Sequence, residues 1–192
     1  MRICDDRYNR DRLRYDLAMW MLSLGARPRT IRAGTGLSED QLRKLRRAYP
    51  SVRTYQPQGK VPRHASDLLQ RSALAWQGNS IACLFRLLGL IPHNPTEARG
   101  IGRLQRAERS CIAYETYRTL YPEAQPRLAF GLAWFVLNAL IAQHLVLNQC
   151  SQCARLYLDS QTRRGRTSCG CSADRLPLPR HRRSTLRPTL KK

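Results

Sequence analysis

The sequence predicts a mainly helical fold that is followed by a small metal site and a disordered basic tail. Apolar residues recur at helical spacing in several segments, and glycine or proline separates these segments. Two close cysteine pairs, Cys150 with Cys153 and Cys169 with Cys171, follow the last apolar segment. Residues 163–192 then hold ten lysines and arginines against a single acid. These three observations predict helices, a metal site and a polyanionic partner.

Length and charge limit the class of protein. A chain of 192 residues is long enough for one core with at most a small satellite domain. Its net charge of +21 predicts attraction to phosphate or anionic lipid. The N-terminus has no apolar leader with a cleavage site, and an odd number of cysteines, seven, argues against a disulfide framework. We therefore expect a cytoplasmic protein.

The first helix is predicted over residues 13–24, after a charged segment that we expect to be frayed. Gly25 stands where a helix commonly stops. The apolar face of this helix consists of Leu13, Leu17, Trp20, Met21 and Leu24.

Residues 27–49 fit a helix-turn-helix. A short helix begins at Pro28, a turn contains Gly36, and Ser38 with Gln41 forms a capping box for a second helix that Pro50 ends. The alternative is an ordinary helical hairpin with a solvated basic face, and the net charge favours the DNA-binding interpretation. The residues expected at DNA are Ser38, Gln41, Arg43, Lys44, Arg46 and Arg47.

Four divisions of the chain follow from this pattern. Residues 1–66 hold the first helix, the helix-turn-helix and a proline-rich linker, and residues 67–147 form a helical body. Residues 148–175 form the cysteine knuckle, and residues 176–192 form a flexible basic tail in which Arg182 and Arg183 are expected to contact DNA.

The helical body is predicted to contain helices over 67–88, with a break at Gly78-Asn79, and over 97–121 and 128–147. The last segment has no charged residue over twenty positions, which is the minimum span of a bilayer. Asn138, Gln143 and His144 argue against a membrane helix. We therefore expect a protein partner, rather than lipid, to cover this helix.

The two cysteine pairs are spaced to place four thiolates around one tetrahedral Zn²⁺. The one-residue spacing of Cys169 and Cys171 is tight, so His181 is the nearest substitute for Cys171. The alternative is free thiols in a reducing cell. His144 is expected to be a core histidine, and Cys4, Cys83 and Cys111 are read as buried or inert thiols.

Catalysis finds little support in the sequence. It contains no phosphate-binding glycine loop, no recognisable nucleophile motif and no HExxH zinc site. A closed four-thiolate zinc site leaves no open position for chemistry. The sequence therefore predicts that this protein is not an enzyme.

From about Leu17 to Cys171 the chain resembles the FlhC family, the larger subunit of the bacterial flagellar master regulator. The similarity is carried by these residues in order: Leu17-Ala18-Met19, Leu24-Gly25-Ala26-Arg27, Leu37-Ser38 with Leu42, Lys44-Leu45, Gly59-Lys60-Val61-Pro62, Ser66-Asp67 and the two cysteine pairs. The resemblance implies a DNA-binding activator that acts in a hetero-oligomer with an FlhD-like subunit and indirectly on RNA polymerase. It also implies one Zn²⁺ per chain, bound by Cys150, Cys153, Cys169 and Cys171.

The sequence departs from the family pattern in three ways. Its second cysteine pair is Cys-x-Cys, the aromatic cluster that usually follows Ser66-Asp67 is replaced by residues 68–71, and arginine is unusually frequent. The resemblance leaves flagellar operons and the transfer genes of mobile elements as alternative targets. A structural RNA-binding zinc protein of the translation machinery and a membrane-associated protein remain the alternatives from other classes.

Overall fold

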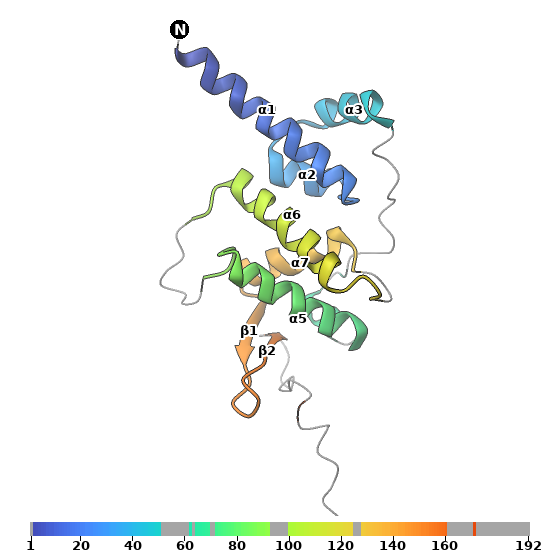
Figure 1. Cartoon of the computed structure of the whole chain (residues 1–192), viewed down its shortest axis with the longest axis vertical. Helices are drawn as coiled ribbons and strands as arrows, with labels where there is room; N and C mark the ends of the chain where they lie inside the picture. Colours follow the sequence, from blue (N-terminus) through green and yellow to red (C-terminus); the bar gives the residue numbers. More distant parts are fainter. Residues whose placement is uncertain are drawn as a thin grey trace, which may run out of the picture.

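The computed structural model describes residues 2–50, 62, 64–69, 72–92, 100–124, 128–160 and 171. Within them, seven helices precede one antiparallel pair of strands (Figure 1). The mainly helical fold class is therefore confirmed. The linker over 51–61 and the tail beyond residue 171 lie outside the described residues.

Helix α1 (Arg2–Ser23) begins earlier than the sequence indicated, because its charged first half is helical rather than frayed. Figure 1 shows this half projecting beyond the other helices. The helix stops as predicted just before Gly25, whose φ of 80° is a left-handed conformation that glycine adopts without strain. The Gly25 and Ala26 N–H groups donate to the Leu22 and Met21 carbonyls at 2.9 Å each.

Helix α6 (Arg103–Leu120) lies at the centre of the fold, between the first helices and the helices that follow the linker (Figure 1). It packs against α1 and α2 (Pro28–Thr35) and also against α5 (Ser72–Leu87) and α7 (Phe130–Ile141). Gly34 of α2 permits this close approach, since a Cβ there would lie 2.9 Å from the Ala107 Cβ. The core is consequently one continuous cluster that includes residues from α1 to strand β2 (Leu156–Ser160).

Helix α5 is uninterrupted, so the predicted break at Gly78-Asn79 is wrong. Gly78 serves packing instead, because a Cβ at this position would lie 3.2 Å from side-chain atoms of both Leu68 and Leu158. Leu68 belongs to the short helix α4 (Ala65–Leu69) and Leu158 to strand β2. Glycine thus lets α4 and β2 approach the same point of α5.

The predicted helix over 128–147 is also wrong in its second half. Helix α7 has only twelve residues, and Gln143 adopts a φ of 58° just before strand β1 (Leu145–Gln149). Nine of the α7 residues are buried by the chain itself, so neither lipid nor a partner is needed to cover this helix. Within the described part of the chain, no helix has both the length and the apolar character to cross a bilayer.

Strands β1 and β2 (Leu156–Ser160) form a hairpin in which Leu147 lies opposite Leu158. Helix α5 holds the hairpin through two hydrogen bonds. The Arg86 guanidinium donates to the Leu147 carbonyl at 3.0 Å, and the Leu158 N–H donates to the Asn79 side-chain oxygen at 2.9 Å. These contacts fix the hairpin to the helical body and leave its turn exposed.

Candidate DNA interface and metal centre

Three cysteines converge at the turn of the hairpin. Cys150 follows β1, Cys153 lies in the turn, and Cys171 returns to the turn from beyond β2. Their Sγ atoms all lie within 4.8 Å of one another, and those of Cys150 and Cys171 are 3.6 Å apart. Sulfurs around a tetrahedral Zn²⁺ lie about 3.8 Å apart, given Zn–S bonds of about 2.3 Å. This cysteine cluster therefore fits three ligands of one metal ion.

The backbone of the turn supports the cluster. The Cys150 N–H donates to the Arg155 carbonyl and the Ala154 N–H donates to the Cys150 carbonyl, each at 2.9 Å. The Gln152 N–H lies 3.4 Å from the Cys150 sulfur and is oriented to donate to it. Hydrogen bonds of this kind orient metal ligands and stabilise the charge of a thiolate.

The other sequence candidates for this site fall in different places. Cys171 lies in the cluster, whereas Cys169 and His181, the alternative to Cys171, lie outside the described residues. His144 is exposed at the opposite end of β1 from Cys150, so the prediction of a core histidine is wrong. Of the four ligands expected, the structure brings together Cys150, Cys153 and Cys171.

Two further thiols lie away from the cluster. Burial raises the pKa of the Cys111 thiol, and the nearby Glu115 and Glu108 carboxylates raise it further. Burial also raises the pKa of Cys83, although Arg86 acts in the opposite direction. Thiols with raised pKa values are poor nucleophiles at neutral pH. The side chain of Cys4 lies outside the described part.

The turn between α2 and α3 (Glu39–Ala48) is fixed by side-chain hydrogen bonds. The buried Thr35 hydroxyl donates to the Ile31 carbonyl at 2.8 Å and accepts from the Leu37 N–H at 3.3 Å. Ser38 Oγ accepts from the Gln41 N–H at 3.2 Å, and Gln41 Oε1 accepts from the Ser38 N–H at 2.8 Å. The predicted capping box is confirmed, and it fixes where α3 begins.

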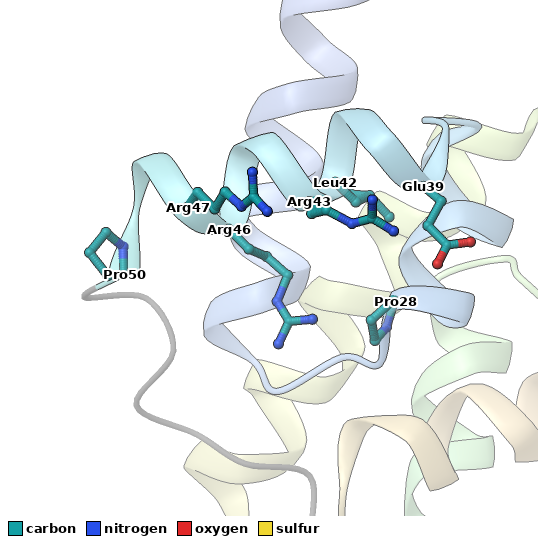
Figure 2. Close-up of a pocket in the computed structure, with 7 residues that line it drawn as sticks. All are labelled: Pro28, Glu39, Leu42, Arg43, Arg46, Arg47 and Pro50. Atoms are coloured by element: carbon teal, nitrogen blue, oxygen red, sulfur yellow. The ribbon is translucent and has the colours of Figure 1, made fainter.

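Two buried leucines set the rotation of α3. Leu42 is 2% exposed and Leu45 is 8% exposed. The four cationic side chains of α3 are all exposed, and we call this set the α3 basic face: Arg43, Lys44, Arg46 and Arg47. Figure 2 shows its three arginines along a groove whose far end is marked by Glu39. The prediction from the sequence that these four side chains are exposed is therefore confirmed.

Two acidic residues in the first turn of α3 form ion pairs with nearby arginines. Asp40 pairs with Arg43 at 3.4 Å, and Glu39 pairs with Arg32 of α2 at 3.4 Å. Such exposed ion pairs contribute little to the stability of the fold. Acidic side chains at a helix N-terminus do, however, interact favourably with the helix dipole and so stabilise the helix. Lys44, Arg46 and Arg47 have no ion-pair partner among the described residues, so these three cations are available to an external anion.

Two surface features were not predicted from the sequence. One is a hollow beside the helix-turn-helix turn, where Arg103 of α6 joins Arg29 and Arg32 of α2. The other is a groove between α1 and α6 that is centred on Trp20. Both depend on packing between segments that are far apart in the sequence, and the local pattern gave no signal for such packing. The tail residues Arg182 and Arg183 lie outside the described residues.

A capped helix-turn-helix with an exposed basic second helix, together with a cluster of three thiols, is typical of DNA-binding regulators that carry a structural metal. Residues 9–183 match the family model of the flagellar transcriptional activator FlhC, and the chain belongs to this family. The family resemblance inferred from the sequence is thereby confirmed. Transcriptional regulators are generally not enzymes. No curated protein matches the chain.

Proposed function

We propose that the chain is a DNA-binding subunit of a transcriptional activator, with α3 as the helix that enters the major groove. The α3 basic face carries this proposal, because buried Leu42 and Leu45 direct its four cations outward. In helix-turn-helix proteins the second helix contacts base edges from its N-terminal residues. Ser38 and Gln41 would therefore lie at the groove, and Arg43, Lys44, Arg46 and Arg47 would reach phosphates or bases.

The cations of the α3 basic face that lack an ion pair within the described part of the chain and the one that is paired with Asp40 are expected to contact different parts of the DNA. Arg46 and Arg47 are exposed and lie one helical turn beyond Arg43, which suits them to phosphates along one strand. Arg43 is held by Asp40, and this pairing suits a side chain that must read a base in a fixed orientation. Tail residues Arg182 and Arg183 would add contacts that do not depend on sequence.

A salt titration tests the DNA-binding proposal. The association constant of the full chain for a 25-bp duplex should fall steeply as the salt concentration rises. In a plot of log association constant against log salt concentration, the slope should be about −0.9 for each phosphate that is neutralised. The double variant Arg46→Gln/Arg47→Gln should lower the magnitude of this slope by about two. Duplex RNA of the same sequence is the comparison. Equal or tighter binding to RNA would contradict the proposal and favour an RNA-binding protein.

We further propose that the cysteine cluster holds one Zn²⁺, with Cys169 completing the set begun by Cys150, Cys153 and Cys171. Four thiolates form a closed tetrahedral site, which stabilises structure and leaves no coordination position for a substrate. The role of the metal would be to hold the turn of the hairpin to the chain that follows β2. This role agrees with a regulator rather than an enzyme.

The partner is proposed to be an FlhD-like helical subunit that binds between α1 and α6 rather than on α7. The α1–α6 groove exposes Leu13 and Leu120, each by 59%, and Ile112 by 38%. Trp20 lies at its centre, where the indole N–H donates to Glu115 at 2.8 Å. The groove is lined by three acids, Asp16, Glu108 and Glu115, although the chain carries a net charge of +21.

An apolar groove lined by acids fits an amphipathic helix with basic side chains at its edges and would repel DNA. Co-expression with an FlhD-like subunit should give one hetero-oligomer. Leu13→Asp/Leu120→Asp should reduce co-purification at least tenfold, because it places charges in the proposed interface. Leu87→Asp is the matched control, since Leu87 is 80% exposed on α5. Equal recovery of the two variants would contradict this assignment of the interface.

A further inference from the structure

The arginines beside the helix-turn-helix turn form a second basic surface. Here the hollow that we call the turn hollow is lined by Arg29 and Arg32 of α2, by Arg103 of α6, and by Gly36, Ser38 and Gln41 of the turn and α3. Its lining includes no acidic residue. Arg29 and Arg103 are exposed, and neither has an ion-pair partner among the described residues.

Packing of α6 against α2 explains the position of Arg103. Gly34 lets Ala107 approach α2 closely, and Gly36 leaves space one turn away for the Arg103 guanidinium. A Cβ on residue 36 would lie 2.6 Å from Arg103 Nη1. The φ of 77° at Gly36 is also the left-handed conformation that the turn requires. The two glycines therefore bring a cation from a distant helix to the edge of the DNA-binding motif.

The turn hollow and the α3 basic face lie on different sides of α3. Glu39, Leu42, Arg43, Arg46 and Arg47 line the groove seen in Figure 2, whereas Ser38 and Gln41 line the turn hollow. A helix in the major groove, which is about 12 Å wide, lies between the phosphate backbones of both strands. If α3 occupies that groove, the α3 arginines face one backbone and the turn hollow faces the other.

We propose that the turn hollow binds a phosphodiester of the second DNA strand and that Arg103 is its principal ligand. This inference rests on the proposed insertion of α3 into DNA. A guanidinium can donate two parallel hydrogen bonds to a phosphate, and such contacts position a protein without selecting sequence. Arg103 therefore sets the depth and orientation of α3, while discrimination between sequences stays with the side chains of α3.

The test uses the full chain and a fluorescent 25-bp duplex over a salt series, with duplex RNA of the same sequence in parallel. Arg103→Gln should lower the magnitude of the log–log salt slope by about 0.9 and weaken binding at moderate salt by roughly three- to tenfold, equally for different DNA sequences. Arg103→Lys should retain most of the slope, because it preserves the charge. Arg118→Gln on the same helix, about 22 Å away along its axis, should change the slope much less.

Thermal unfolding of each variant should match the unchanged protein, since Arg103 is exposed. Equal slopes for Arg103→Gln and Arg118→Gln would overturn this inference while leaving the proposed function intact, provided that Arg46→Gln/Arg47→Gln still weakens binding. A loss confined to RNA would overturn the assignment of the hollow to DNA. Absence of duplex binding by the unchanged protein would overturn the proposed function and this inference together.

Discussion

The helix-turn-helix and the cysteine hairpin are both short structures, but different forces stabilise them. Helices α2 and α3 bury Ile31, Leu42 and Leu45 in the core that also contains α1 and α6. The hairpin buries Leu145, Leu147 and Leu158 near its base, whereas residues 149–156 include no buried side chain. Apolar packing can therefore support the first structure, whereas we propose that the turn of the second depends on metal bound by its thiols.

We propose that this difference separates two roles within one chain. The helix-turn-helix presents its cations from a rigid base, because the side chains that hold it belong to the core. The hairpin turn has no such base, so we expect its order to depend on metal. Changes in one structure should consequently leave the properties of the other intact, and this independence can be tested.

The largest effect is expected from loss of metal. One equivalent of zinc should be found per chain, and Cys150→Ser, Cys153→Ser or Cys171→Ser should remove it, because each loses a ligand of the cluster. Hydrogen exchange over 149–156 should rise strongly, whereas α2 and α3 should stay protected. Metal analysis and hydrogen exchange by mass spectrometry measure both properties. Cys83→Ala is the control, and folded protein without zinc would contradict the prediction.

A smaller but still large effect is expected from Leu42→Ala. This side chain is 2% exposed in the core, so its truncation should lower the free energy of unfolding by about 2–5 kcal/mol. Urea denaturation measures the change, and Lys44→Ala on the exposed side of α3 should remain within about 0.5 kcal/mol. Folded Leu42→Ala protein should still bind one zinc. Loss of zinc from this folded variant would break the proposed independence of the two structures.

The smallest effect is expected at the start of α3. Ser38→Ala removes the hydroxyl that accepts from the Gln41 N–H, which should cost about 1 kcal/mol in the free energy of unfolding. Ser38→Thr should recover most of this stability, since threonine also caps helices. Chemical denaturation of the three proteins makes the comparison. Equal stability of the alanine variant and the unchanged protein would show that the capping box contributes nothing measurable.

Local signals predicted much of the helix-turn-helix from the sequence. Ser38 with Gln41, Gly25, and the spacing of Leu42 and Leu45 each act within one or two helical turns, so their structural effect could be read directly. The proximity of Cys150 and Cys153 was readable for the same reason.

Features that depend on distant contacts were not predicted. Residues 145–147 are a short apolar run, and periodicity alone does not distinguish a strand from the end of a buried helix. These residues form a strand because they pair with β2, which lies on the other side of the hairpin turn. The role of Gly78 depends on Leu68 and Leu158, and the position of Arg103 depends on how α6 packs on α2. Sequence spacing contains no information about these approaches.

We propose that α3 reads a DNA sequence. Selection from a random duplex pool by the full chain with its partner subunit tests this claim most directly. We expect an enriched motif, and Arg43→Gln should reduce discrimination by about 1–3 kcal/mol at particular positions, because this side chain is proposed to read a base. Arg118→Gln should select the same motif as the unchanged protein. Recovery of no motif from a pool that the complex binds tightly would contradict the claim.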